Sequence, residues 1–125
     1  MKEGSHVGHG AIIHGAIIGK NCLVGMNSVI MDNVELGDEC IVGALSFIKE
    51  GEIIPSGSLV VGNPAKIIKE VSKEMTDWKT AGTLLYQQLP ENYYRSLKLC
   101  KPKRKPGKKH FTKMVADYFP LKTKS

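Results

Sequence analysis

The 125-residue sequence contains no apolar run of about 18 residues, the length that a membrane-spanning helix requires. Its first residues include no apolar segment of the kind that signal peptides carry. The three cysteines, Cys22, Cys40 and Cys100, are odd in number and widely spaced, which argues against a disulfide framework. CxxC, Walker and HExxH motifs are also missing. We therefore expect a cytoplasmic protein that makes no contact with a membrane.

Basic charge is scarce in residues 1–96 and concentrated in residues 97–125. The formal net charge of +6 divides into −3 for the first segment, with 8 basic and 11 acidic residues, and +9 for the second, with 10 basic residues and one acid. Lysine together with proline and glycine in residues 101–125 indicates a flexible basic tail. The charge of the whole chain is therefore no argument for nucleic-acid binding, and we expect none.

Aromatic residues are absent before Phe47, whereas 11 of the 13 glycines lie within the first 62 residues. In this segment a large aliphatic residue recurs every six residues, with one step of five. These residues are Val7, Ile13, Ile18, Val24, Ile30, Leu36, Val42, Ile48, Ile54 and Val60. A period of six fits neither a helix nor an alternating strand. It is typical of a solenoid in which three short strands form each coil of about 18 residues.

The repeat predicts an all-β solenoid over residues 1–68, a parallel β-helix of about three coils, left-handed as is usual for this fold type. The aliphatic residues fill its interior, and the smaller residues four positions later, among them Cys22 and Cys40, also point inward. Ser72 is a suitable N-cap for a helix. We expect a C-terminal α-helical segment over residues 69–100, in which Pro90 opens a second short helix.

Three of the four histidines lie at the start of the repeat, and the register directs two of them outward. His9 follows inward-facing Val7 by two positions, and His14 follows inward-facing Ile13 by one. Both imidazoles are predicted to project near one level of the solenoid, on either side of a corner. Three imidazoles make a catalytic zinc site, and two on an outward surface invite completion by a neighbouring chain. The alternative is that both are solvated corner residues.

The segment Val7-Gly8-His9-Gly10-Ala11-Ile12-Ile13-His14-Gly15 carries a resemblance to a known family, together with residues 23–32, 58–66 and 78–87. It resembles the γ-class carbonic anhydrases, and most of all the branch found in phenylacetate-degradation and carnitine operons. The resemblance covers about residues 3–90. It implies a homotrimer with zinc, or iron or cobalt in the same site, held between subunits by three histidines from two chains.

By this resemblance His9 serves a site shared with one neighbour, and His14 serves a site shared with another. The family's third histidine lies in an earlier coil that has no counterpart here, so we expect this chain to be the C-terminal part of a longer protein, or of a gene with a misassigned start. His6 is the candidate substitute for that ligand. Tyr86 resembles a tyrosine of the family's C-terminal helix that reaches the active site, and Asn27 is a second polar candidate for a catalytic role.

The chemistry implied by the resemblance is attack of zinc-activated water on CO2, giving bicarbonate, or on an acyl-CoA thioester. Two alternatives stay open. One is a hexapeptide-repeat acyltransferase, which would bind coenzyme A near the turn at residues 62–66. The other is a non-catalytic trimeric assembly module that lacks a working site.

Overall fold

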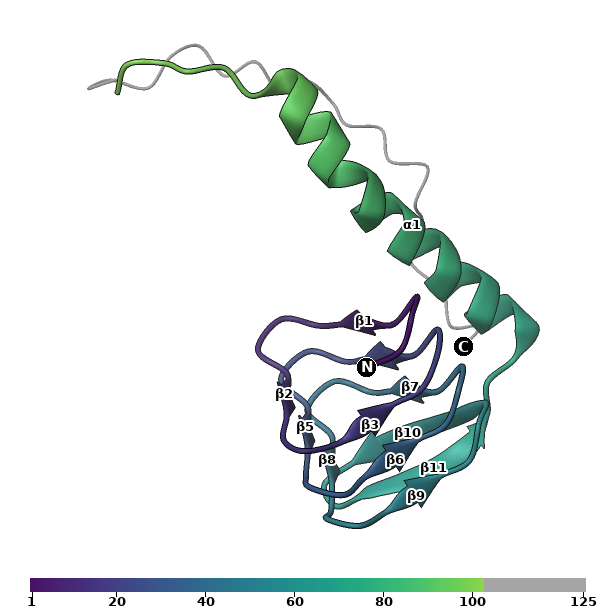
Figure 1. The fold of residues 1–125 in the computed structure, drawn as a ribbon. Coiled ribbons are helices and arrows are strands. Elements are labelled where there is room, and N and C mark those ends of the chain that lie inside the picture. The colour runs from purple at the N-terminus through teal and green to yellow at the C-terminus, as the bar shows by residue number, and fades with distance from the viewer. Residues whose placement is uncertain (103–125) are drawn as a thin grey trace.

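The computed structural model describes residues 1–102, which form a triangular β-solenoid followed by one long helix (Figure 1). The elements in chain order are β1 (His6–Val7), β2 (Ile12–Ile13), β3 (Ile17–Ile18), β4 (Leu23–Val24), β5 (Val29–Ile30), β6 (Glu35–Leu36), β7 (Ile41–Val42), β8 (Phe47–Ile48), β9 (Ile53–Ile54), β10 (Ser58–Gly62), β11 (Ala65–Glu70) and α1 (Lys73–Ser96). Except for residues 101 and 102, the predicted basic tail lies outside the described residues.

The short strands stack into three parallel sheets, one on each face of the prism. Their orders are β1-β4-β7-β10, with β11 added at the end, β2-β5-β8 and β3-β6-β9. Val24 pairs with Val42, and Val42 with Val60, so one coil takes 18 residues. The solenoid of about three coils that the repeat predicts is confirmed.

The interior of the prism is filled by the aliphatic residues of the repeat. Five of these residues have no exposed surface: Ile18, Val24, Ile30, Ile48 and Val60. Leu36, Val42 and Ile54 are also buried, with at most 5% exposed. Cys22 and Cys40 are fully buried among them, as the sequence predicts. The Cys22 thiol donates to the carbonyl of Gly37, and the Cys40 thiol to that of Pro55, so both serve the packing of the core.

Glycine is required at two kinds of corner position for different reasons. At Gly25, a Cβ atom would lie 2.5 Å from the backbone nitrogen of Ala44 in the next coil, closer than real Cβ contacts come. At Gly51, a Cβ atom would meet nothing within 4 Å, but the backbone has φ of +72°. The first glycine therefore permits close stacking of the coils, and the second permits a left-handed turn.

These two glycines give a paired prediction about stability. We expect Gly25→Ala to lower the free energy of unfolding by about 2 kcal/mol, because two backbones must separate. We expect Gly51→Ala to lower it by about 1 kcal/mol, the cost of a left-handed alanine. Urea denaturation at one fixed protein concentration measures both values. A larger loss for Gly51→Ala than for Gly25→Ala would contradict this assignment.

The end of the solenoid differs from the sequence prediction. Strand β10 turns back at Asn63–Pro64 into β11, which pairs with it antiparallel as far as Glu70, two residues beyond the boundary we placed at residue 68. Helix α1 then begins at Lys73, where the Ser72 hydroxyl accepts from the backbone N–H of Met75 as predicted. The expected second helix is wrong, since α1 continues through Pro90 to Ser96. An interior proline removes one helical hydrogen bond, and here that loss does not end the helix.

Helix α1 packs on the outside of the β1-β4-β7 sheet. Lys79 and Thr83 are its buried residues, whereas every residue from 90 to 96 is exposed. Figure 1 shows the helix leaving the hairpin, passing the strands of this sheet and extending beyond β1. The first half of α1 is therefore the part that shapes the surface around the histidines. No helix within residues 1–102 is long and apolar enough to cross a membrane.

Candidate functional site

The two outward histidines stand at opposite ends of strand β2. His9 lies in the turn before β2, and His14 follows directly after it. Both are exposed, as the register predicts. They do not flank one corner, as we expected, but lie on two successive corners of the prism. The reason is that the strand on each face has only two residues. The chain therefore turns at His9, runs along β2 and turns again at His14, so the face that contains β2 separates the two imidazoles.

The face between the two histidines is apolar. Ile13, Ile30 and Ile48 of β2, β5 and β8 point inward, so their neighbours in the chain point outward. These outward residues are Ile12, which is 53% exposed, and the half-buried Val29 and Phe47. The β2-β5-β8 sheet thus presents a column of three large apolar side chains.

His14 is oriented by an aspartate that the sequence analysis did not assign a role. Its Nδ1 atom lies 2.8 Å from the Asp32 carboxylate, although both side chains are exposed. The corner after β2, residues 14–16, is one residue shorter than the corresponding corner of the next coil, residues 31–34. Gly15 in the shorter corner leaves the space that the Asp32 carboxylate occupies. A carboxylate at Nδ1 favours the tautomer that keeps Nε2 free as an acceptor toward the outside.

The described residues of one chain do not complete a metal site. No group of three or more His, Cys, Asp or Glu side chains within residues 1–102 lies close enough to hold a metal ion. What this part of the chain offers is a pair of exposed imidazoles on two corners, one of them oriented by a carboxylate. Such a pair is suited to a site shared between copies of the chain.

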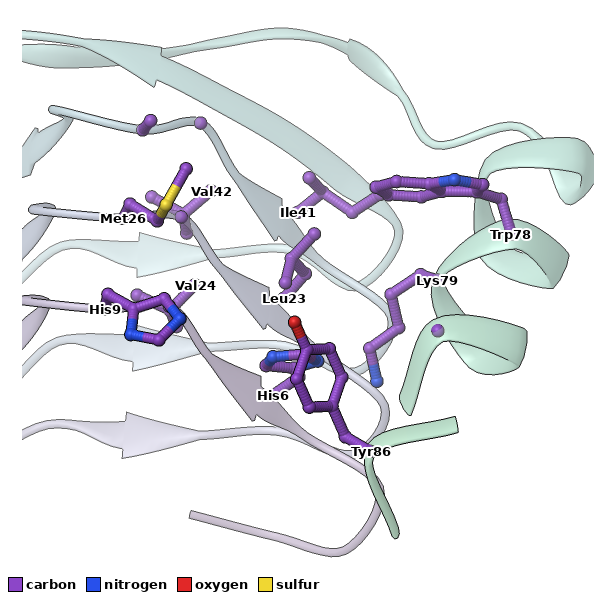
Figure 2. Close-up of a pocket in the computed structure, with 15 residues that line it drawn as sticks. His6, His9, Leu23, Val24, Met26, Ile41, Val42, Trp78, Lys79 and Tyr86 are labelled. Carbon is purple, nitrogen blue, oxygen red and sulfur yellow. The ribbon is translucent and has the colours of Figure 1, made fainter. Parts of the chain in front are cut away.

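A groove of about 350 Å³ runs between α1 and the β1-β4-β7 sheet, with His9 in its wall (Figure 2). Leu23 of β4 and Ile41 of β7 point from the sheet toward the helix and form its floor. Met26 lies on the side of His9, whereas Trp78 lies across the groove on α1. This volume falls within the range of small-molecule pockets.

Tyr86 and His6 form an aromatic pair in the same groove. Their ring centroids are 4.9 Å apart and the rings are nearly perpendicular, at 79°. Burial first, and then the charges of Lys79 and His9, lower the pKa of His6 below its ordinary 6.5. The structure therefore brings Tyr86 and His9 to one groove, whereas His14 and Asn27 are not among the residues that line it.

Asn27 has a structural role at the corner above His9. Its backbone has φ of +54°, and its N–H donates to the carbonyl of His9 at 2.9 Å. Asparagine adopts this left-handed conformation more readily than most residues. Its side chain covers Gly10, which has no Cβ to collide with it. A catalytic role for Asn27 stays a prediction.

Lys79 is a residue of this region that the sequence analysis missed. Only 3% of its surface is exposed, and its ammonium donates to the carbonyl of Gly4 and, at 2.7 Å, to Oδ1 of Asn21. Burial lowers the pKa of Lys79. Its spacing of four residues from both Met75 and Thr83 places it on the packed face of α1, which is the signal that could have found it.

The comparisons place this geometry among known proteins. Residues 15–50 match the model described as "Bacterial transferase hexapeptide (six repeats)". The chain is 44% identical to "Carnitine operon protein CaiE" of Salmonella agona over 102 residues, 82% of this chain and 52% of that protein. It therefore spans about half the length of the curated relatives it matches.

Two solved structures share the fold of the described residues. A "putative acetyltransferase" from Bacillus cereus is 36% identical with a TM-score of 0.70, covering 76% of this chain and 55% of that one. A mutant of perosamine N-acetyltransferase from Caulobacter crescentus, in complex with CoA and GDP-perosamine, is 27% identical with a TM-score of 0.50, covering 53% of this chain and 31% of that one.

Proposed function

The chain is a hexapeptide-repeat protein related in sequence to the carnitine operon protein CaiE, and on this premise we propose that it forms a trimer with a zinc site between its subunits. In this proposal His9 of one copy and His14 of the next hold the metal. Zinc bound by imidazoles supplies an activated water nucleophile near neutral pH. The electrophile is the carbonyl carbon of CO2 or of an acyl-CoA thioester.

The observation that carries the proposal is the contact between His14 and Asp32. Histidines that bind metals commonly donate their second ring N–H to a carboxylate, which fixes the tautomer and the orientation of the ring. Here Nδ1 lies 2.8 Å from the Asp32 carboxylate, which leaves Nε2 for a ligand. An exposed pair of this kind contributes little to the stability of the fold. Orientation of a metal-binding ring is therefore the role we assign to it.

The positions of the two histidines suit a cyclic assembly. In a ring of three copies, each copy presents one edge of a face to the opposite edge of the same face on its neighbour. If the β2-β5-β8 face points toward the axis, the His9 corner of one copy meets the His14 corner of the next. The apolar column of Ile12, Val29 and Phe47 on that face would then be covered.

A catalytic zinc site has three protein ligands, and His9 and His14 supply only two of them. The resemblance to the γ-class carbonic anhydrases implies a histidine from an earlier coil. Among residues 1–102, His6 is the candidate that lines the same groove as His9. In this proposal the Tyr86 hydroxyl, also in that groove, hydrogen-bonds the substrate carbonyl. His9, Tyr86 and the apolar floor together hold the substrate and exclude water.

Zinc content and molar mass in solution test the proposal directly. We expect a trimer with about one zinc per chain, because each of three interfaces forms one site. Chelation should remove the metal together with the activity, which assays of CO2 hydration and of acyl-CoA hydrolysis identify. A trimer without zinc would overturn the enzymatic proposal and favour the assembly module. A zinc-free monomer would overturn the assembly as well.

An acyltransferase is the second candidate, and the solved structures favour it. The fold is shared with an enzyme bound to CoA, and hexapeptide transferases are the family whose model matches residues 15–50. Such an enzyme needs an acceptor substrate and no metal. Acyl transfer to an acceptor that persists after chelation would favour this candidate over the zinc site.

The role of Asp32 gives a separate prediction. We expect Asp32→Asn to weaken zinc binding about tenfold, since a neutral amide orients and polarises the His14 ring less than a carboxylate does. The melting temperature should change little because both side chains are exposed. Competition with a coloured chelator measures the affinity. Glu35→Gln, which removes an exposed carboxylate from β6, is the control and should bind zinc like the wild type.

A further inference from the structure

Most residues that line the groove under α1 are apolar or glycine, and its polar residues are His6, His9, Lys79 and Tyr86. Leu23 and Ile41 form the floor, and Met26 and Trp78 stand on opposite sides (Figure 2). Leu23 and Ile41 are outward-facing strand residues that would be in contact with solvent if α1 did not pass over them. A groove with this lining favours an uncharged, apolar ligand over a sugar or a nucleotide.

The buried ammonium of Lys79 does not change that preference. Its hydrogen bonds go to the Gly4 carbonyl and to Asn21, so the charge is already engaged within the protein. The His6 ring packs edge-on against the ring of Tyr86, with the centroids 4.9 Å apart, and in the proposed function His6 is the candidate third ligand of the metal. The polar parts of the groove left to meet a ligand are the proposed metal-binding end at His9 and the hydroxyl of Tyr86. A ligand of this groove therefore has one polar end and an apolar remainder.

Gly82 keeps the groove open from the helix side. It lies within α1, where glycine costs about 1 kcal/mol of helix stability relative to alanine. It also lines the groove and lies four residues from both Trp78 and Tyr86, on the same face of the helix, so we expect a side chain at this position to enter the groove. A residue unfavourable for the helix thus stands where any larger side chain would narrow the groove.

We propose that this groove binds the aliphatic acyl chain of a thioester, with the carbonyl carbon toward His9 and the chain toward Trp78. The inference rests on the proposed function, whose reacting carbon lies beside His9. It commits that site to thioesters, because CO2 has no apolar remainder to fill a groove of about 350 Å³. The similarity to a solved enzyme in complex with CoA supports a thioester of coenzyme A.

Trp78 makes the binding measurable without any reaction. It is the single tryptophan of the chain and lies in the groove wall, so its fluorescence reports on occupancy. Acyl-CoA thioesters from acetyl to decanoyl would be titrated into chelator-treated protein. Each added methylene should tighten binding about fourfold until the groove is full. Coenzyme A without an acyl group should leave the emission of Trp78 unchanged.

Two substitutions on α1 complete the test. Gly82→Leu should abolish the dependence on chain length, because leucine fills the groove while favouring the helix. Ala81→Leu, on the exposed neighbouring position, should bind like the wild type. Equal affinity for acetyl- and decanoyl-CoA in the wild type, or unchanged binding in Gly82→Leu, would overturn the inference.

The failure of the inference and of the proposed function can be told apart. Binding is measured on metal-free protein, so a missing zinc site does not affect it. Zinc content that is normal in Gly82→Leu, together with loss of decanoyl-CoA binding, supports the inference alone. Zinc-bound wild-type protein that shows no fluorescence response to any acyl-CoA overturns the inference while leaving the shared zinc site standing.

Discussion

Neither His9→Ala nor His14→Ala should bind zinc alone, yet trimers refolded from an equal mixture of the two variants should regain about one quarter of the wild-type metal content. Each interface needs His9 from one copy and His14 from the next. In a random mixture, half of the copies supply each histidine, so one interface in four is complete. Zinc content of the isolated trimers, measured by atomic emission, gives the result.

The control is an equal mixture of wild-type protein with His9→Ala, which should hold about half of the wild-type zinc. That value holds whether a site takes its histidines from one chain or from two. The mixture of the two single variants is the discriminating case. If it contains no zinc while the control holds half, both histidines serve one site within a chain, and the shared site is wrong.

Much of the fold is predictable because a solenoid repeats one local rule. A large aliphatic residue every six positions sets the interior, and the 18-residue coil then determines which strands pair, as Val24, Val42 and Val60 show. The same register correctly places His9 and His14 outward. These features follow from periodicity alone, because each coil meets only its immediate neighbours.

Contacts that depend on the reach of a side chain are not predictable from the repeat. The strand register places Ile30 beside Ile13, and the backbone N–H of His14 donates to the Ile30 carbonyl. Asp32 lies beside His14 at the corner where the first coil is one residue shorter than the second. The β11 strand is missed for a related reason, since an antiparallel hairpin ends the periodic pattern on which the prediction rests.

The position of α1 is likewise a tertiary result, and Lys79 carries the polar contacts that fix it. Its ammonium donates hydrogen bonds to the Gly4 carbonyl and to the side chain of Asn21, which also bonds Thr80. Gly4 and Asn21 lie at corresponding corners of two successive coils. A lysine in a predicted helix is ordinarily assigned to solvent. Here its long stem crosses the packed face, and the helical spacing that places Lys79 on that face does not show which groups its ammonium reaches.

We expect Lys79→Ala to lower the free energy of unfolding by about 3 kcal/mol, because two partly buried acceptors lose a charged donor and the stem leaves a void. The fluorescence emission of Trp78, the residue directly before Lys79, should shift toward that of an exposed indole as α1 loosens. Urea titrations followed by fluorescence and by circular dichroism at one protein concentration measure both effects.

Lys73→Ala is the matched control, because Lys73 lies on the same helix and pairs with Asp77 at 2.8 Å on an exposed surface. An exposed pair four residues apart contributes about 0.5 kcal/mol or less, so this variant should unfold nearly like the wild type. Lys79→Met separates the two causes in turn, since methionine retains most of the stem and removes the donor. Equal losses in Lys79→Ala and Lys73→Ala would show that the buried ammonium does not anchor the helix, and the groove beneath α1 would then need another support.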